Sequence, residues 1–166
     1  MTAPSEAGTS PLAPPDLLRR VFRQQASTVA VITLPGPVGF TATSLTSASA
    51  EPPVVSFGVA ETSSCWPALA EAPYAGVHLL AEDQRELAET FARHGADRFA
   101  PPTRWRPGPQ GVPLLDGALA WLVCRITARV PAGNHRVVLA EPVAGDPTSP
   151  GRPLLYHQGR YRALDA

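Results

Sequence analysis

Short runs of β-branched and apolar residues, each ended by Pro or Gly, recur along most of this chain. Residues 28–34 (TVAVITL) form one such run, and after the turn PGPVG the chain returns through FTATSLTSAS. Tight turns of this kind join antiparallel strands, because parallel strands need a long crossover between them. The pattern therefore predicts a β-hairpin at residues 28–49.

The same pattern continues toward the C-terminus. Residues 53–60 predict a third strand after a Pro-Pro break, and residues 74–80 predict a fourth. A second hairpin is expected from residues 118–130 and 135–143, and a last strand pair from residues 153–164. About seven strands linked mostly by turns favour a mainly β fold, an antiparallel barrel rather than a βαβ sheet.

The N-terminal segment differs in composition from the rest. Residues 1–15 are mostly Pro, Ala, Ser and Thr, which predicts a disordered leader before one domain over residues 16–166. The domain begins with DLLRRVFRQQA, which predicts an amphipathic helix with Asp16 as its N-cap. Its apolar face would hold Leu17, Leu18, Val21 and Phe22.

Two further short helices are predicted between the strands. One follows serines at a cap position and carries Pro67 in its first turn. The other, DQRELAETFARHG, pairs Asp83 as N-cap with Glu86 and ends at Gly95. The next segment, residues 96–113, is rich in Pro and Gly and predicts an irregular surface loop.

Charge and cysteine content exclude several classes of protein. Fourteen basic and fourteen acidic residues cancel, so the chain lacks the positive field that holds nucleic acids or anionic membranes. Every basic residue is Arg, which excludes a Schiff-base or P-loop lysine. Cys65 and Cys124 are too far apart to suggest a metal knuckle or a disulfide framework, and no apolar stretch could span a membrane. We expect a cytoplasmic protein with reduced thiols.

Familiar catalytic motifs are missing from the sequence. No serine lies in a G-x-S-x-G elbow, no His or Cys pair has a ligand spacing, and no G-x-G-x-x-G follows a strand. Nucleophilic catalysis, metal binding and a Rossmann nicotinamide site are therefore not indicated. We expect His78, which lies on a predicted strand, to be a structural residue with satisfied hydrogen bonds.

Two clusters of hydroxyl side chains remain. Residues 39–49 carry Thr or Ser at more than half of their positions, which fits either a solvated edge strand or a set of donors for a flat, polar-edged ligand. Thr62, Ser63 and Ser64 precede a predicted helix, where hydroxyls either cap the helix or bind an anion.

In order and spacing, six segments of the chain resemble the short-chain flavin reductases with the FMN-binding split-barrel fold. These segments are FRQQASTVAVIT, GFTATSLTSASAEPPVVSF, ETSSCWPALAEAPYAGVHLLAEDQRELAETFARHGADRF, VPLLDGALAWLVCRI, GNHRVVLAEPV and PLLYHQGRY. The resemblance implies an antiparallel split β-barrel of Greek-key type and a homodimer. It further implies an NAD(P)H:flavin oxidoreductase that supplies reduced FMN or FAD to a partner monooxygenase.

The resemblance also implies which residues meet each ligand. Residues 43–46 would line the isoalloxazine, with Thr41 and Ser49 nearby. Residues 62–65 would hold the flavin phosphate, and Arg98 and Phe99 would cover the flavin. The implied flavin residues are Thr41, Thr43, Ser44, Leu45, Thr46, Ser49, Thr62, Ser63, Ser64, Cys65, Arg98 and Phe99. The implied nicotinamide residues are His135, Tyr156, Gly159, Arg160 and Tyr161, with His135 positioning the ring and no single residue essential for catalysis.

The chain departs from the family pattern in ways that affect binding. It lacks the glycine of A-T-G-V at residues 26–29, Glu61 stands where a Lys often precedes the serines, and Cys65 replaces a Thr. A carboxylate near a phosphate weakens anion binding, so we expect the flavin to be a substrate or a loosely held cofactor. We expect NADH rather than NADPH, because no arginine cluster is evident beside the last strand pair; Arg136 and Arg160 are the possible exceptions.

Two other functions fit the same fold. One is a flavoenzyme with a different electron acceptor, such as ferric iron or a bound organic substrate. The other is a non-catalytic module that binds flavin or haem. The GNH segment at residues 133–135 and the YHQGRY segment at residues 156–161 favour the reductase.

Overall fold

The computed structural model describes residues 10–147 and 149–165. Most of the expected leader, residues 1–9, lies outside this range, and residues 10–14 are exposed with neither helix nor strand. Helix α1 (Pro15–Phe22) then begins at a proline whose fixed φ suits the first helical position. Asp16 therefore lies in the first turn and is not the N-cap, so that prediction is wrong.

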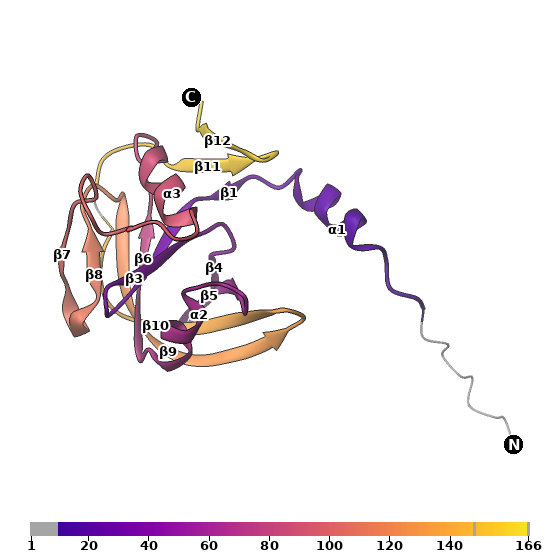
Figure 1. The fold of residues 1–166 in the computed structure, drawn as a ribbon, viewed down its shortest axis with the longest axis horizontal. Helices are drawn as coiled ribbons and strands as arrows, with labels where there is room; N and C mark the ends of the chain where they lie inside the picture. Colours follow the sequence, from indigo (N-terminus) through magenta and orange to yellow (C-terminus); the bar gives the residue numbers. More distant parts are fainter. Residues whose placement is uncertain (1–9, 148, 166) are drawn as a thin grey trace, which may run out of the picture.

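The main sheet confirms the mainly β, antiparallel prediction. Its strands run in the order β3-β2-β6-β9-β10-β5-β4, and every neighbouring pair is antiparallel (Figure 1). The strands are β2 (Ala30–Leu34), β3 (Val38–Ala42), β4 (Thr46–Ala50), β5 (Pro53–Ala60), β6 (Tyr74–Leu79), β9 (Ala120–Ala132) and β10 (His135–Asp146).

The two edge strands of this sheet, β3 and β4, are neighbours in sequence. Only residues 43–45 separate them, although a single strand was predicted through this segment. Because the chain from Ala42 to Thr46 spans at most about 14 Å, the sheet must curl until its two edges approach each other. The backbone N–H of Gly58 donates to Ser44 Oγ at 2.9 Å, which ties this link to β5.

Two smaller sheets complete the fold. One contains β1 (Ser27–Thr28), β11 (Leu154–His157) and β12 (Arg160–Ala163), which confirms the predicted last strand pair. The other pairs β7 (Trp105–Pro107) with β8 (Pro113–Leu115), with a 3-10 turn, η1 (Pro109–Gly111), between them. Part of the expected irregular loop is therefore a hairpin, because Val112, Leu114 and Leu115 bury their side chains.

Helix α3 (Arg85–Ala92) packs on β3. Phe91 is fully buried, and a Cβ added to Gly39 would lie 2.8 Å from its ring, so the helix rests directly on the strand backbone. Asp83 is not the N-cap, which corrects the predicted capping box. Gln84 occupies that position, and its Oε1 accepts the Ala81 N–H at 3.0 Å, closing the turn ahead of the helix.

Helix α2 (Trp66–Glu71) also begins without a side-chain cap. Cys65 stands at its N-cap position, and Ser63 Oγ accepts the Cys65 N–H at 3.2 Å. Ser63 therefore closes a turn ahead of the helix. Of the two roles considered for these serines, capping of the helix is not observed. In the described part of the chain, no helix is long and apolar enough to cross a membrane.

His78 is a structural residue, as expected. Its side chain is fully buried, its Nε2 accepts the Leu115 N–H at 3.1 Å, and its Nδ1 lies 3.2 Å from the Val31 carbonyl oxygen. These partners fix the neutral ring with the proton on Nδ1. Burial accordingly lowers the pKa of His78 to about 4.

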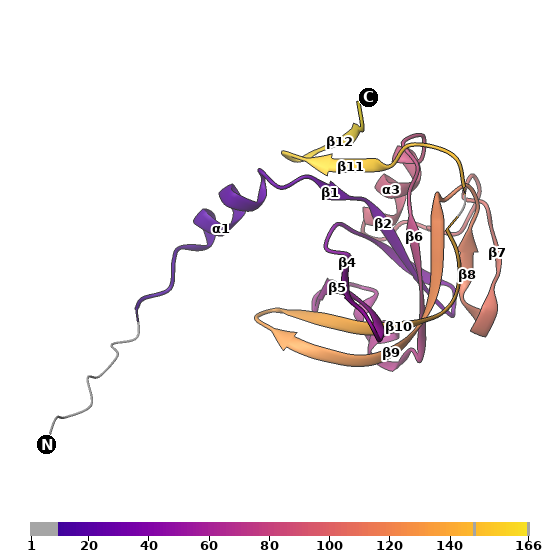
Figure 2. The ribbon, with the colours of Figure 1, turned by 180° about the vertical axis from the view of Figure 1, so that it is seen from behind.

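Helix α1 stands apart from the barrel, as the two opposite views in Figures 1 and 2 show. None of its residues is buried. Within the described part of the chain, the helix is tied to the last strand pair at its C-cap residue, where Arg23 Nη2 donates to the Gln158 carbonyl at 3.4 Å and the Gln158 N–H donates to the Arg23 carbonyl at 3.2 Å. Its apolar side chains therefore remain uncovered by the rest of the described chain.

Candidate functional site

One cavity of about 510 Å³ lies where β3, β5, α3 and the turn ahead of α2 meet. This volume is within the range of small-molecule sites. Four segments that are distant in sequence contribute predicted site residues to its lining. These residues are Thr41, Thr43, Ser44, Ser63, Ser64, Arg98 and His135.

Several of these side chains are fixed by the fold. Thr41 Oγ1 donates to the Ala88 carbonyl at 2.6 Å, which couples β3 to α3. Ser44 Oγ accepts the Gly58 N–H and keeps its own proton for another acceptor. His135 Nδ1 lies 2.7 Å from Asn134 Oδ1, so a proton on Nδ1 leaves Nε2 as an acceptor.

Arg98 supplies positive charge to the same cavity. Its Nη1 donates to the Gly39 carbonyl at 2.8 Å, and its Nη2 donates to the Arg93 carbonyl at 3.0 Å. Its Nε is buried without a hydrogen-bond partner. Among residues 10–147 and 149–165, no Asp or Glu lines this cavity. The guanidinium and the two serines therefore form a region suited to an anion, as the phosphate of a flavin requires.

Cys65 takes a different place from the one expected. It is only 1% exposed, its Sγ lies 3.3 Å from the Gly39 carbonyl oxygen, and Arg98 Nη1 approaches Sγ at 2.9 Å. The residue thus helps to position Arg98 and does not line the cavity. Thr62 and Phe99 do not line it either. Phe99 instead packs edge-on between the rings of Phe91 and Trp105.

The link at residues 43–45 separates this cavity from two others. One, of about 820 Å³, brings Leu45 and Thr46 beside Tyr156 and Gly159. The other, of about 760 Å³, is lined by Thr41 and Thr43 together with the remaining residues that were predicted to meet the nicotinamide: Tyr156, Gly159, Arg160 and Tyr161. Thr43 lines all three cavities. Ser49 lies on β4 and lines none of them.

The predicted nicotinamide residues are therefore divided. His135 shares the first cavity with Ser63 and Ser64, whereas the other four lie on the far side of Thr43. In that group the rings of Tyr156 and Tyr161 meet edge-on at 5.2 Å. A ligand that contacts both groups has to pass over Thr43.

Glu61 does not act as the free carboxylate that was expected near the anion region. Its Oε1 lies 2.6 Å from Arg136 Nε, without the alignment of a hydrogen bond, and Arg136 also lies over the Trp66 ring. The ion pair offsets the negative charge of Glu61, and neither residue lines the cavity. Only the fold could show this pairing, because β5 and β10 bring the two residues together.

An arginine cluster lies beside the last strand pair, which corrects the expectation that none would. Between α1 and the β11–β12 hairpin, a cavity of about 730 Å³ is lined by Arg20, Arg23, Arg160 and Arg162. Arg160 was considered from the sequence, but Arg20 and Arg23 were not, because they are distant from it along the chain. Their spacing of three on an amphipathic helix was the available signal.

Comparisons with known proteins identify the family of this chain. Residues 22–165 match the family described as Flavin reductase like domain. An NADH:FMN oxidoreductase of Rhodococcus qingshengii is 42% identical over 150 residues, which cover 86% of this chain and 78% of the relative. The flavin-dependent monooxygenase reductase subunit HsaB of Mycobacterium tuberculosis is 32% identical over 156 residues, covering 91% and 83%.

A solved structure resembles the fold closely. The Streptomyces globisporus C-1027 NADH:FAD oxidoreductase SgcE6, in complex with NAD and FAD fragments, superposes with a TM-score of 0.86 at 33% identity. The match covers 94% of this chain and 98% of that chain.

Proposed function

This chain belongs to the flavin reductase like domain family, and on that premise we propose that it transfers a hydride from NADH to FMN or FAD. The observation that carries the proposal is the junction at Thr43. There, a cavity with an anion region meets a second cavity lined by tyrosines and arginines. Two nucleotides that enter from the two sides would bring their rings together at this junction.

The flavin would occupy the first cavity. Ser63, Ser64 and Arg98 would bind its phosphate, because hydrogen bonds to an ionised phosphate are stronger than those between neutral groups. The hydroxyl of Ser44 and the neighbouring backbone N–H groups would donate to the polar edge of the ring. Donors placed there stabilise the negative charge that the ring gains on reduction.

The nicotinamide would approach from the second cavity, between Thr43 and the pair formed by Tyr156 and Tyr161. His135, on the opposite side of Thr43, would accept a hydrogen bond through Nε2 from the carboxamide. The bound flavin and nicotinamide supply the redox chemistry, so the chain has to orient them and exclude other geometries. No side chain in this arrangement has to donate or remove a proton for the hydride to move.

We further propose that reduced flavin leaves for a partner monooxygenase. The support is the similarity to HsaB, which is a reductase subunit of such an enzyme. The residues that would hold the flavin phosphate also favour exchange, since Ser64 is exposed and Ser63 and Arg98 are only partly buried. The free thiols of Cys65 and Cys124 fit a reducing compartment, for which we propose the cytoplasm.

A homodimer is also proposed. Leu18, Val21 and Phe22 of α1 are 63%, 57% and 59% exposed. Apolar side chains gathered on one projecting helix need a protein surface to cover them. β3 and β4 are the edge strands of the main sheet, and unpaired strand edges point to the same need.

The test is steady-state oxidation of NADH by the purified protein with FMN, FAD or ferric iron as the only acceptor. The proposal requires NADH consumption that depends on FMN or FAD. Turnover with ferric iron alone would support the flavoenzyme with another acceptor. Flavin binding without NADH consumption would support the non-catalytic module, and either result would contradict the proposal.

A further inference from the structure

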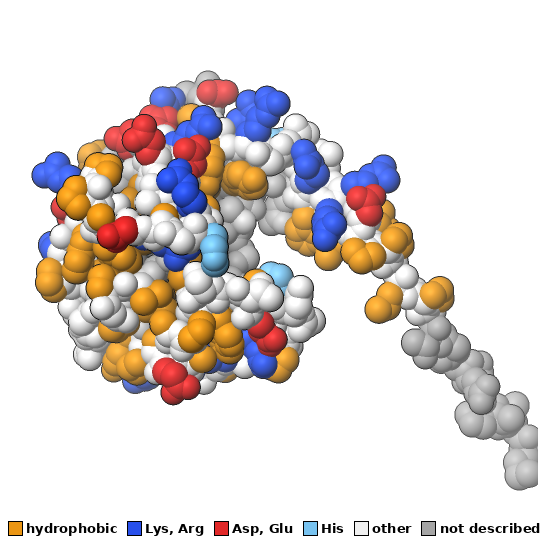
Figure 3. All heavy atoms as spheres, viewed as in Figure 1, with side chains coloured by type: hydrophobic (Ala, Val, Ile, Leu, Met, Phe, Trp, Pro, Cys, Tyr) orange, Lys and Arg blue, Asp and Glu red, His pale blue; other side chains and the backbone are white. Residues whose placement is uncertain are grey.

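The arginine cluster of Arg20, Arg23, Arg160 and Arg162 is the most strongly charged hollow that the proposed flavin and nicotinamide positions leave unused. Figure 3 shows blue side chains along α1 and on the adjoining end of the barrel. Among the described residues, no carboxylate lies within ion-pair distance of Arg23, Arg160 or Arg162. The contact between Arg20 and Asp16 spans 4.0 Å with both side chains about three-quarters exposed, so it neutralises little.

The cavity that holds the cluster offers more than positive charge. Leu17 and Val21 line it beside the arginines, and so do Gln24 and Gln158. One arginine guanidinium group can bind two phosphate oxygens at once. Apolar side chains provide a surface for a planar base. The combination suits an adenosine diphosphate group better than inorganic phosphate.

The cluster is continuous with the proposed nicotinamide cavity. Arg160 and Arg162 line both, and the nicotinamide cavity in turn shares Thr41 and Thr43 with the flavin cavity. One acidic residue, Glu89, lines the proposed nicotinamide cavity, and it is paired with Arg85 at 2.8 Å. A path of lining residues therefore leads from the junction at Thr43 to the cluster.

We infer that Arg20, Arg23, Arg160 and Arg162 bind the adenosine diphosphate half of the nicotinamide dinucleotide. The inference rests on the proposed function, because it assumes that a dihydronicotinamide reaches Thr43. FAD carries the same adenosine diphosphate group, but its phosphates would extend from Ser63 and Ser64. These two serines line neither the proposed nicotinamide cavity nor the cavity of the arginine cluster. The path to the cluster therefore favours NADH as the source.

The test compares NADH with reduced nicotinamide mononucleotide, which lacks the adenylate half, at saturating FMN. Arg20→Gln and Arg162→Gln should each raise the KM for NADH about two- to five-fold, the size expected for exposed ion pairs. The KM for the mononucleotide should rise less than the KM for NADH in both variants, because the mononucleotide keeps only one of the two phosphates and lacks the adenosine. Added salt should raise the KM for NADH in the wild type more than in the double variant, because salt screens exposed charges.

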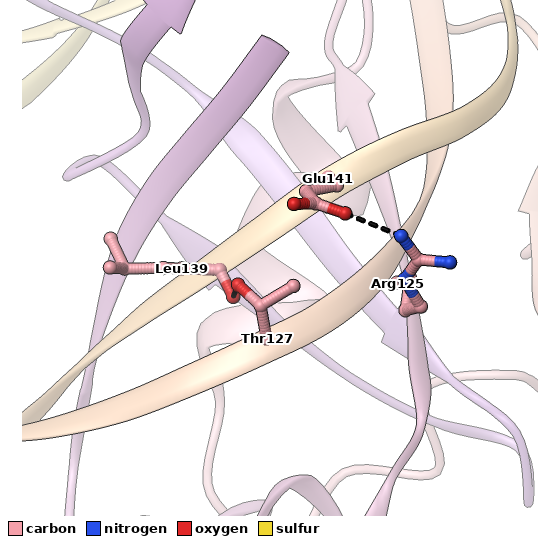
Figure 4. Close-up of polar contacts among 4 residues, drawn as sticks. All are labelled: Arg125, Thr127, Leu139 and Glu141. Atoms are coloured by element: carbon pink, nitrogen blue, oxygen red, sulfur yellow. Dashed lines mark hydrogen bonds and ion pairs between the residues drawn. The ribbon is translucent and has the colours of Figure 1, made fainter. Parts of the chain in front are cut away.

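A matched control is available on the outer face of the barrel. Arg125 of β9 pairs with Glu141 of β10, beside the hydrogen bond from Thr127 to the Leu139 carbonyl (Figure 4). Neither charge lines the cluster or the flavin cavity. Arg125→Gln removes the same charge as the test variants and should leave both KM values unchanged.

Binding of ADP-ribose, measured by calorimetry, provides a readout that does not require turnover. Its affinity should fall in the Arg20→Gln and Arg162→Gln variants by the same factor as the KM for NADH rises. Equal changes for NADH and the mononucleotide, or no change for either, would overturn the inference. A rise in the KM for FAD but not for FMN would assign the cluster to the flavin and overturn it as well. A wild-type protein that oxidises neither nucleotide but binds ADP-ribose through these arginines would instead contradict the proposed function.

Discussion

Arg136 and Glu61 form an ion pair, with Nε 2.6 Å from Oε1, at the point where β5 leads into the turn that carries Ser63. The pair leaves the anion region with Arg98 as its cation and with the negative charge of Glu61 offset. If the flavin is held loosely, as we expect, the cause is therefore not a free carboxylate at Glu61. The exposed position of Ser64 and the partial exposure of Arg98 are sufficient reasons for it.

Glu61→Gln should tighten FMN binding about two-fold at low salt, because it leaves the positive charge of Arg136 uncompensated close to the phosphate. The dissociation constant can be measured from the quenching of flavin fluorescence. Glu141→Gln frees Arg125 in the same way on the outer face of the barrel and should have no effect (Figure 4). Weaker binding in Glu61→Gln would show that the pair supports the turn and does not merely offset a charge.

Ser64→Ala should weaken FMN binding about ten-fold, which corresponds to about 1.5 kcal/mol for a hydrogen bond to a charged group. Riboflavin lacks the phosphate, so its affinity should not change. Ser47→Ala, an exposed serine of β4 outside the flavin cavity, serves as the control. If riboflavin loses affinity as much as FMN does, Ser64 contacts the ring or shapes the turn, and the phosphate assignment fails.

His135→Ala should raise the KM for NADH about three- to twelve-fold through the loss of one hydrogen bond of about 0.5 to 1.5 kcal/mol. The dissociation constant for FMN should remain nearly unchanged. Steady-state kinetics with varied NADH, together with flavin titrations, separates the two effects. His135 shares its cavity with Ser63 and Ser64, so a variant that loses flavin affinity at constant KM for NADH would place this residue on the flavin.

Much of the fold follows from local patterns in the sequence, and its departures have physical reasons. Hairpins were predicted at residues 28–49 and 118–143 because strand runs and turn residues alternate there, and they form as β2–β3 and β9–β10. The break between β3 and β4 at residues 43–45 was not predicted, because Thr and Ser occur equally well in a strand and in a link between strands. Only the curling of the sheet, which brings its two edges together, requires a link at that point.

The candidate site was predictable where its residues lie in local motifs, but not where distant segments meet. The hydroxyls at residues 41–44 and 63–64 were identified as two separate clusters, and the structure brings them into one cavity. Arg20 and Arg23 could not be placed beside Arg160 from the sequence alone. Their position depends on the contact between Arg23 and Gln158.

His78 should make the stability of the protein depend on pH. Burial lowers its pKa from the ordinary histidine value of 6.5 to about 4 in the folded protein. Below pH 6.5, His78 becomes protonated in the unfolded chain but stays neutral in the folded protein. The free energy of unfolding therefore falls until the pH reaches about 4. The loss should total about 3 kcal/mol.

Urea unfolding across this pH window, in the wild type and in His78→Gln, measures the effect. The glutamine keeps an amide donor and acceptor but does not titrate, so the difference in stability between the two proteins should shrink or reverse as the pH falls. Parallel pH profiles would show that His78 is not the group responsible.

Leu18→Asp should convert a dimer into a monomer, because it places a charge in the apolar face of α1 that we propose is covered by the second subunit. Arg19→Gln changes an exposed neighbour on the same helix and should leave the dimer intact. Light scattering measures the mass of each protein. A wild-type protein that is monomeric at micromolar concentration, with activity intact, would be incompatible with this proposal.

The most direct test of the central claim is a single turnover without oxygen, in which protein and FMN are mixed rapidly with NADH and the flavin absorbance is followed. The account predicts that the oxidised flavin band disappears at a rate that saturates with NADH and that slows in Ser64→Ala at subsaturating FMN. A flavin band that persists at saturating NADH, or that bleaches no faster than in a solution without protein, would contradict it.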